Sequence, residues 1–581
     1  MLKKVLIANR GEIAVRVIRA CRELGLSTVA VHPADDLDSR HVREADQAFL
    51  LEKGYLDVEG IVALALQAGA DAVHPGYGFL SENPALARRT IDAGLTWVGP
   101  NPDAIERMGS KTVARQMAEA SAVPVVPGLL SAFETVEEAL TFAAEHGYPC
   151  IVKAAAGGGG KGMQVVRAAE EFEPAIRKAQ REGAAYFGSG EVFVERYLDR
   201  PRHVEIQILG DRRGQLLAVG ERECSIQRRH QKLVEECPSP ALDAGLRARM
   251  EAAAIALGRA VGYDSAGTCE FLVQDGQFYF LEMNTRIQVE HTVTEEVYGL
   301  DLVAAQLRVA AGEPLEAIVG DRLEARGWAI QCRINAEDPA RNFMPGPGRL
   351  TRYRPPCGPG IRVDDGIEEG GRISERYDSM VAKLIARGRT RAEAIARMRR
   401  ALDEFVVEGV PTTLPLHRAI LAHEAFANGD LSTRFLESTL PPASLPFEPF
   451  VPAADAPVEE PAERTFEVRV NRERFAVSVK EIGGVAAVTG VQKRTRSTRK
   501  AAAPTASADD LQAPMHATVR KVLVEVGQAV ETGQPLVVVE AMKMESELGA
   551  PRSGIVKAIQ VQPGDVIEAR QVLVKLGDAD A

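Results

Sequence analysis

The chain has 581 residues, a formal net charge of −11, 45% hydrophobic residues and 26% charged residues. This length exceeds what one hydrophobic core can hold and predicts roughly four domains of about 150 residues each. The composition is typical of a soluble globular protein, the negative charge disfavours a general nucleic-acid binder, and no apolar run reaches the roughly 18 residues of a membrane span.

The seven cysteines are scattered, odd in number and form no CxxC pair. This pattern favours a reducing, cytoplasmic location over a disulfide framework or a zinc site. Near the N-terminus, Arg10 and Glu12 interrupt the apolar run too early for the hydrophobic segment of a signal peptide.

The first 110 residues alternate between strand and helix patterns, which predicts a parallel sheet covered by helices. The expected elements are strands at 3–8 and 27–31, a helix at 11–25 with Ile13, Val17, Cys21 and Leu24 on one face, and a strand that ends in the glycine-rich loop 71–84.

A glycine-rich segment, IVKAAAGGGGKGMQVV (151–166), follows an expected strand and precedes an expected helix. Glycine lets backbone N–H groups approach phosphate oxygens, and Lys153 and Lys161 supply positive charge. The segment is not a Walker A loop, because Gly162 stands where that motif has Ser or Thr. Taken alone, it fits a phosphate loop, a flexible lid or a linker.

Two further stretches gather polar side chains. In HVEIQI, His203, Glu205 and Gln207 alternate with apolar residues and so share one face of a strand. In ECSIQRRHQKLVEE, cations crowd together and would repel one another unless an anion or carboxylates lay close by; a solvated basic turn is the alternative. These cations are Arg228, Arg229, His230 and Lys232.

From Leu281 to Glu290, apolar and polar residues alternate strictly. We therefore expect an extended segment whose back packs in the core while its polar face forms a site. This face combines acids, amides and a cation, and lacks the Lys and Thr of a solvent-facing strand. It consists of Glu282, Asn284, Arg286, Gln288 and Glu290.

The hairpin before this segment turns at Asp275-Gly276. A two-residue Asp-Gly loop is the commoner turn, but it would place Glu270 and Glu282 on opposite faces. A loop with an odd number of residues would place Glu270 directly opposite Glu282, where two like charges make sense as a site for a divalent cation. We therefore predict the odd-numbered loop.

The C-terminal segment contains two copies of one small β unit, offset by 37 residues. Each copy has short β-branched runs broken by Gly or Pro. Between them, the stretch VVVEAMKMESELGA places Lys543 on the connection, so we expect a small barrel that presents this lysine. The matching pairs are Ala513/Ala550, Pro514/Pro551, Val519/Val556, Val524/Val561, Gly527/Gly564 and Gln534/Gln571.

The segment before this barrel shows the composition of linkers. Residues 440–463 are rich in Pro and Ala, 465–479 predict a small hairpin around Asn471-Arg472, and 491–510 are basic and then rich in Ala and Ser. The second linker would span roughly 25 Å as a flexible coil and about 70 Å when extended, so we expect the barrel to move relative to the preceding domains.

Nine motifs along residues 1–445 resemble those of the biotin carboxylase family of ATP-grasp enzymes. They are IANRGEIA, HPGYGFLSEN, MGSK, KAAAGGGGKGM, ERYLDRPRHVE, CSIQRRHQK, EMNTRIQVEH, CRINAEDP and YDSM. AMKM resembles the biotin carboxyl carrier (biotinyl) domain, in which the lysine carries biotin. The combination is similar to the α-chain of an acyl-CoA carboxylase. The chain departs from the common family pattern at Arg196 (often Lys), Thr292 (often Pro) and His516 (often Pro).

The resemblance implies a multi-domain α/β fold with five parts. They are a Rossmann-like N-terminal domain (1–112), an ATP-grasp domain (113–325) with a lid at about 128–200, a C-terminal biotin carboxylase domain (326–445), a linker with a hairpin (446–510) and an all-β, lipoyl-like biotinyl barrel (511–578).

The resemblance also implies cofactors and site residues. Biotin would be attached at Lys543, and ATP would bind with Mg2+ or Mn2+ held by Glu270, Glu282 and Asn284. The ATP-binding residues would be Lys111, Lys153, Gly159, Gly160, Glu195, Arg196, Tyr197, Leu198, His203, Gln227, His230, Glu270 and Glu282.

By the same resemblance, Lys232, Arg286, Gln288 and the Val289 backbone would hold bicarbonate. Glu290 would be the base that deprotonates it for attack on the γ-phosphate, and we expect Arg286 to keep Glu290 ionised. Arg333 would stabilise charge that develops on biotin.

The implied function is a ligase that carboxylates biotin and passes the carboxyl group to a separate carboxyltransferase subunit of an acetyl- or propionyl-CoA type carboxylase. A biotin protein ligase and a homodimer or larger hetero-oligomer are further expected partners. A subunit of a split pyruvate or urea-type carboxylase is an alternative, and a biotin-carrying scaffold with an inactive ATP site is a non-enzymatic one.

Overall fold

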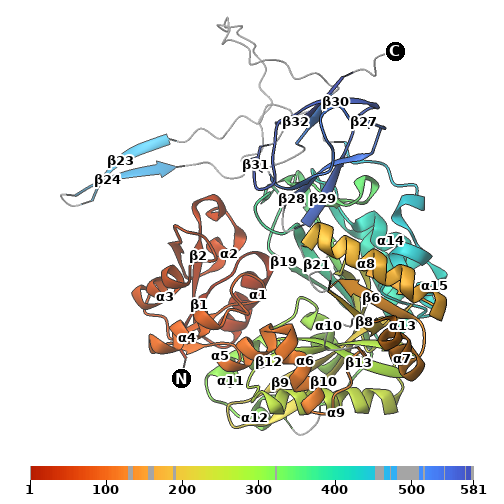
Figure 1. Cartoon of the computed structure of the whole chain (residues 1–581). Helices are drawn as coiled ribbons and strands as arrows, with labels where there is room; N and C mark the ends of the chain where they lie inside the picture. Colours follow the sequence, from red (N-terminus) through yellow and green to blue (C-terminus); the bar gives the residue numbers. More distant parts are fainter. Residues whose placement is uncertain are drawn as a thin grey trace, which may run out of the picture.

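The structure is a computed structural model that describes residues 2–128, 135–154, 163–187, 191–320, 323–451, 464–470, 473–479, 510–513, 517–541, 544–568 and 571–577. Within these residues no helix is both long enough and apolar enough to cross a membrane. Figure 1 shows the N-terminal part beside a larger antiparallel sheet, with a small barrel above.

The N-terminal part is a parallel five-stranded sheet of order β3-β2-β1-β4-β5, as the strand and helix patterns predict. Helix α1 buries Ile13, Val17 and Cys21, but it ends at Glu23, and Leu24 remains 37% exposed, contrary to the expectation that it shares their face. The elements are β1 (Lys4–Ile7), α1 (Gly11–Glu23), β2 (Ser27–His32), α2 (Arg40–Glu44), β3 (Gln47–Leu50), α3 (Val58–Gln67), β4 (Ala72–His74), α4 (Pro84–Asp92), β5 (Thr96–Trp97) and α5 (Pro102–Gly109).

A second, smaller sheet of order β7-β6-β8 is antiparallel and packs against two helices through its own apolar cluster. Its elements are α7 (Val136–His146), β6 (Cys150–Ala154), β7 (Met163–Val166), α8 (Phe172–Phe187) and β8 (Val192–Arg196), after the connecting helix α6 (Lys111–Ala120).

The largest sheet has eight strands in the order β13-β12-β9-β10-β11-β14-β21-β19, all paired antiparallel. Its strands are β9 (Arg202–Gly210), β10 (Leu216–Arg228), β11 (Gln231–Cys237), β12 (Ala266–Gln274), β13 (Gln277–Asn284), β14 (Trp328–Asn335), β19 (Ile361–Asp365) and β21 (Met380–Gly388). Because β11 pairs with β14, the sheet continues across the boundary that we expect near residue 325.

Helices cover this sheet, and short two-stranded sheets accompany its C-terminal half. The helices are α9 (Ala244–Ala260), α10 (His291–Tyr298), α11 (Leu302–Ala310), α12 (Leu315–Val319), α13 (Arg391–Glu404), α14 (Leu414–Ala422) and α15 (Glu424–Ala427). The short strands are β15 (Glu337–Asp338), β16 (Met344–Pro345), β17 (Gly348–Arg349), β18 (Arg352–Arg354), β20 (Arg372–Ile373) and β22 (Val406–Glu408).

The barrel consists of two four-stranded sheets, β25-β32-β30-β27 and β29-β28-β26-β31, around one apolar cluster. The predicted repeat is confirmed by its hydrogen bonds. Gly527 N–H donates to Val556 O at 2.8 Å, and the equivalent Gly564 N–H donates to Val519 O at 2.7 Å. The strands are β25 (Leu511–Gln512), β26 (Ala517–Val522), β27 (Ala529–Val530), β28 (Pro535–Ala541), β29 (Met544–Gly549), β30 (Gly554–Ile559), β31 (Val566–Ile567) and β32 (Val572–Gly577).

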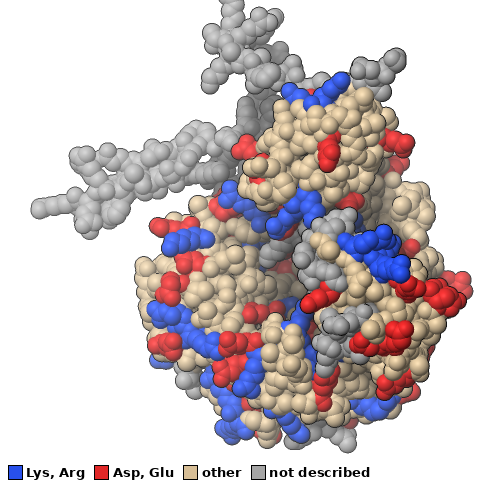
Figure 2. Space-filling model, in the orientation of Figure 1, with Lys and Arg blue, Asp and Glu red and all other residues tan. Residues whose placement is uncertain are grey.

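Before the barrel, β23 (Arg464–Val470) and β24 (Glu473–Val479) form the hairpin that the sequence predicts. Over the visible face of the described residues, acidic and basic side chains are interspersed (Figure 2).

Candidate active site

The β12–β13 hairpin has a two-residue loop, so the predicted odd-numbered loop is wrong. Gln274 pairs with Gln277, and Asp275 and Gly276 both adopt positive φ, at 53° and 71°. These are the dihedral signs of the tight turn that an Asp-Gly pair favours, and local turn chemistry therefore decides the loop.

Glu270 nevertheless lies directly opposite Glu282, because the register shifts between Glu270 and Phe271. Phe271 pairs with Phe280, and Leu281 is left over as a bulge residue, 46% exposed. A β-bulge adds one residue to one strand and thus turns the following side chains to the other face. The proposed carboxylate pair forms by this route and not through the loop.

The residues proposed for the metal fit a divalent cation. Asn284 Nδ2 donates to Glu270 Oε1 at 2.8 Å, while Glu282 has no hydrogen-bond partner among the described residues. Burial and then the charge of Glu270 raise the pKa of Glu282. Two facing carboxylates with a nearby amide are the ligands that Mg2+ takes alongside ATP phosphates.

Lys232 on β11 is the centre of the buried charge network. Its Nζ lies 2.6 Å from Glu205, 2.8 Å from Glu270 and 2.7 Å from Glu290. Burial by itself would lower the pKa of Lys232, but these carboxylates outweigh it and the pKa is raised well above its ordinary value. The sequence expectation that carboxylates surround this cation is confirmed for Lys232.

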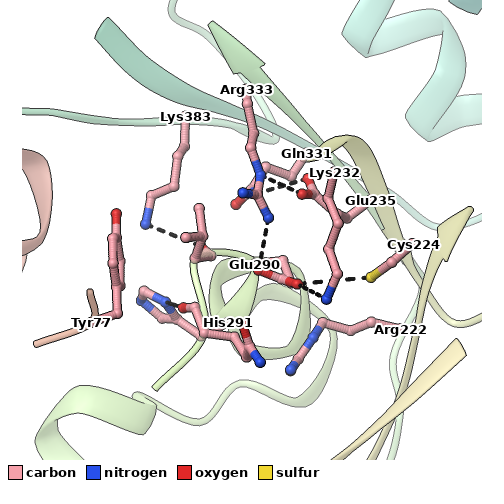
Figure 3. A network of polar contacts seen from close by, with 12 residues as sticks. Tyr77, Arg222, Cys224, Lys232, Glu235, Glu290, His291, Gln331, Arg333 and Lys383 are labelled. Atoms are coloured by element: carbon pink, nitrogen blue, oxygen red, sulfur yellow. Dashed lines mark hydrogen bonds and ion pairs between the residues drawn. The ribbon is translucent and has the colours of Figure 1, made fainter. Parts of the chain in front are cut away.

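Glu290 lies immediately before α10, fully buried between two cations (Figure 3). Its carboxylate accepts from Lys232 at 2.7 Å and from Arg333 Nη2 at 2.9 Å, and the Cys224 thiol lies 3.9 Å away. Burial would raise the pKa of Glu290, but Lys232 and Arg333 hold it well below the ordinary value.

Arg286 does not contact Glu290, contrary to the expectation that it keeps this acid ionised. Its Nε donates to Glu82 at 2.9 Å, and its two Nη atoms donate to Asn284 Oδ1 at 2.8 Å and Gln288 Oε1 at 2.9 Å. Arg333, 43 residues beyond Glu290 in the chain, takes the expected role because β14 runs beside β11.

The expected extended segment ends early. Strand β13 stops at Asn284, and the chain continues as a loop until α10 begins at His291. The polar side chains still converge, since Gln288 Nε2 lies 3.4 Å from Glu270 Oε1 and Arg286 joins Asn284 to Gln288. A tight loop can gather these groups as well as a strand does.

The residues that the sequence predicts to bind the nucleotide fall into two groups. His203 lies in the buried network, with Nε2 2.8 Å from Glu270, and Gln227 pairs with Lys232 across β10 and β11. Lys111 and His230 are exposed, the latter in a turn with φ of 68°. Within the described residues neither forms a hydrogen bond to the network, although the charge of Lys111 acts to lower the pKa of Glu282.

The small sheet carries the remaining described residues of the nucleotide group. Lys153 forms an ion pair with Glu195 between β6 and β8. Arg196 Nη1 donates to His146 O at 3.0 Å, and its own N–H donates to Pro127 O at 2.9 Å. Tyr197 N–H donates to Pro149 O at 2.9 Å, and Leu198 is buried. Gly159, Gly160 and Lys543 lie outside the described residues.

The sequence reasoning missed several buried members of this network. Arg222 is fully buried and donates to Glu205, Gln207, Thr268 and Thr294. Almost all of this strand is buried, and a buried arginine requires such partners. Glu235 and Gln331 were also missed; Glu235 accepts from Arg333 Nε and from Gln331 Nε2.

A buried row of acids, amides and lysine on an antiparallel sheet, facing a small sheet with a lysine on its central strand, defines an ATP-grasp type ligase. Family models agree with this class. They match the Biotin carboxylase, N-terminal domain (1–105), the Carbamoyl-phosphate synthase L chain, ATP binding domain (110–318), the Biotin carboxylase C-terminal domain (331–438) and the Biotin-requiring enzyme model (509–576).

The chain is also similar to whole proteins. It is 46% identical to the biotin-dependent acyl-coenzyme A carboxylase alpha3 subunit of Mycobacterium leprae (strain TN), over 99% of this chain and 98% of that one. It is 39% identical to the mitochondrial propionyl-CoA carboxylase alpha chain of Homo sapiens, over 99% and 91%. The biotin carboxylase domain of a thermophilic 2-oxoglutarate carboxylase, bound to bicarbonate, matches with a TM-score of 0.72 and 44% identity over 75% of this chain and 98% of that one.

The chain belongs to the family of biotin-dependent acyl-CoA carboxylase alpha subunits. It joins an ATP-dependent biotin carboxylase to a biotin carrier domain, and its cofactors are biotin, ATP and Mg2+.

Proposed function

We propose that this chain carboxylates biotin attached to Lys543, using ATP and bicarbonate, for a separate carboxyltransferase subunit of an acyl-CoA carboxylase of the acetyl- or propionyl-CoA type. The observation that carries the proposal is the placement of Glu290 between Lys232 and Arg333. Three relatives that match 99% of this chain are acyl-CoA or propionyl-CoA carboxylase alpha chains, so the pyruvate alternative is not better supported. A biotin protein ligase and a second copy of the chain are further partners in this proposal.

The proposed binding step brings bicarbonate against Arg286, Gln288 and the Val289 backbone. Arg286 is positioned for this by Glu82 and Asn284, which fix its guanidinium plane. Lys232 contributes its ammonium group, which at present donates to three carboxylates. Bidentate arginine and a buried lysine suit a small, planar oxyanion.

The proposed base is Glu290. In the ligand-free site its depressed pKa makes it a weak base, because Lys232 and Arg333 stabilise the carboxylate. When bound bicarbonate takes a donor from Lys232, Glu290 loses part of that stabilisation and its proton affinity rises. It then accepts the bicarbonate proton, a carbonate oxygen attacks the γ-phosphorus, and the bond to the bridging oxygen of ADP breaks.

Glu270, Glu282 and Asn284 would hold Mg2+, which neutralises phosphate charge during transfer. Lys111, Lys153 and His203 would contact the ATP phosphates or ribose. The ion pair between Lys153 and Glu195 satisfies both groups until a nucleotide displaces it. Biotin, when attached, supplies the nitrogen that takes up the carboxyl group, and Arg333 would hold the negative charge that develops next to it.

The attachment site fits the barrel. Ala541 on β28 pairs with Met544 on β29, so two residues connect these strands, and Lys543 is one of them.

The test is ATP hydrolysis by the purified chain with bicarbonate, with and without free biotin, beside Glu290→Gln and Lys543→Arg variants. We expect hydrolysis that biotin stimulates, loss of this stimulation in Glu290→Gln, and its retention with free biotin in Lys543→Arg. Mass spectrometry should find biotin on the unmodified chain and none on Lys543→Arg. A biotinylated chain without biotin-dependent hydrolysis would instead support the inactive scaffold.

A further inference from the structure

Two consecutive backbone carbonyl groups just before α10 are each held by a buried side chain (Figure 3). His291 Nδ1 lies 2.6 Å from Gln288 O, and Lys383 Nζ donates to Val289 O at 3.2 Å. Both His291 and Lys383 are fully buried. Burial holds the pKa of His291 well below its ordinary value, so the ring is neutral, and the short contact with a carbonyl requires the proton on Nδ1.

These contacts also determine where two N–H groups point. In a trans peptide the C=O and the following N–H lie on opposite sides of the bond, and the cis peptides of the described chain are elsewhere. When His291 fixes the Gln288 carbonyl, the Val289 N–H must point the opposite way. Lys383 orients the Glu290 N–H in the same manner through the Val289 carbonyl.

The two N–H groups are available for a ligand. Within the described residues, neither the Val289 N–H nor the Glu290 N–H has a hydrogen-bond partner. Both precede the first turn of α10, where the helix dipole adds positive potential. A buried loop seldom leaves two adjacent donors unused unless an anion or water binds there.

Residues of the N-terminal part of the chain contact Lys383 and fix its position. Its Nζ lies 3.0 Å from Glu12 on α1 and 3.9 Å from Asp364 on β19, and its ammonium group lies 5.9 Å from the ring centre of Tyr77. Lys383 also pairs with Arg333 across β21 and β14. The Val289 carbonyl is therefore fixed relative to both the N-terminal sheet and the strand that carries Arg333.

We propose that His291 and Lys383 are positioning residues for bicarbonate, which aim the N–H groups of Val289 and Glu290 at the anion held by Arg286 and Gln288. This inference rests on the proposed function, because it concerns the same anion. Neither residue touches the substrate in this proposal; each acts through the backbone of the loop.

The test measures KM for bicarbonate, KM for ATP and kcat in biotin-dependent ATP hydrolysis by the full-length chain. His291→Leu removes the donor to Gln288, whereas His291→Asn keeps an N–H donor at the position of Nδ1. Lys383→Met is combined with Glu12→Gln, so that no unpaired carboxylate remains next to the new methionine. His41→Leu is the control, since His41 is a fully buried histidine of the N-terminal part that contacts Tyr55.

We expect His291→Leu and the double variant each to raise the bicarbonate KM about 10-fold, as for loss of one hydrogen bond to an anion, with the ATP KM unchanged. The bicarbonate KM of His291→Asn should stay close to that of the unmodified chain. Binding of 13C-labelled bicarbonate, followed by NMR, should be weaker in His291→Leu and in the double variant than in His291→Asn. His41→Leu should lower the melting temperature without changing the bicarbonate KM.

An unchanged bicarbonate KM in both His291→Leu and the double variant would overturn the inference. Changes of similar size in the bicarbonate KM, the ATP KM and kcat, with the same changes in His41→Leu, would also overturn it, because that result shows a general effect of stability. Failure of the unmodified chain to hydrolyse ATP in response to bicarbonate would overturn the proposed function itself, so the two failures are distinguishable.

Discussion

Lys232 and Glu290 lie 2.7 Å apart in the core of the site, although 58 residues separate them in the chain. Lys232 comes from β11 and Glu290 from the start of α10, and Lys232 also contacts Glu205 and Glu270. One cation thus holds three buried carboxylates together, and removal of any partner leaves uncompensated charge in a buried region.

Replacement of Lys232 by Met should therefore affect both stability and activity. We expect the free energy of unfolding to fall by about 3–5 kcal/mol, because three buried carboxylates lose their common partner. Biotin-dependent ATP hydrolysis should fall at least about 1,000-fold. Urea unfolding and steady-state kinetics measure the two effects, with the exposed Lys557→Met as the control. A Lys232→Met protein of unchanged stability would contradict the geometry.

The low pKa of Glu290 predicts a specific pH dependence of stability. Burial acts against it, but Lys232 and Arg333 lower this pKa well below the ordinary value of 4.5. A carboxyl with a depressed pKa in the folded state stabilises the protein fully above its unfolded pKa, and this contribution is lost as the pH falls through the folded value. The melting-temperature difference between the unmodified chain and Glu290→Gln should thus stay constant from pH 5 to 8 and shrink below about pH 4.5. A difference that already shrinks near pH 6.5 would show that Glu290 titrates near neutrality.

Glu282 should behave in the opposite way in the absence of metal. Burial and the neighbouring Glu270 raise its pKa, so its charged form destabilises the fold once the pH exceeds the unfolded value. In buffer with a chelator at pH 7.5, Glu282→Gln should melt about 1–3 °C higher than the unmodified chain. With ATP present, the same variant should need at least about 10-fold more Mg2+ for half-maximal hydrolysis. Equal Mg2+ dependence in both proteins would remove Glu282 from the metal site.

The repeat in the barrel predicts matched effects at two glycines. Gly527 and Gly564 have φ of 92° and 98°, and an added Cβ would meet no atom within 4 Å at either position. Alanine therefore costs only backbone strain, about 1–2 kcal/mol at each site, and similar amounts at both because each N–H makes the equivalent bond. Differential scanning calorimetry of the full chain should show the barrel transition lowered alike in Gly527→Ala and Gly564→Ala. Widely different shifts would contradict the equivalence of the two halves.

Much of the architecture could be predicted because its signals are local. The run at Lys4–Ile7, the helix from Gly11 and the alternation from His203 to Ile208 depend on neighbours within a few residues, and the structure contains all three elements. The repeat of the barrel was readable for the same reason, since each half carries its own turns. Arg333 and Glu290 could be named through family motifs, but their contact could not be inferred from spacing.

The sequence by itself determined the parallel N-terminal sheet and the repeated barrel, because side-chain periodicity and turn chemistry act over short distances. Only the tertiary structure decided how these residues combine. The bulge at Leu281 brings Glu270 opposite Glu282 despite the two-residue turn, and β14 supplies Arg333 to Glu290 in place of Arg286. The bulge lies within a single hairpin, whereas Arg333 and Glu290 meet because segments far apart in the chain pack together. In that buried packing every unpaired charge is costly, and this cost selects the partners.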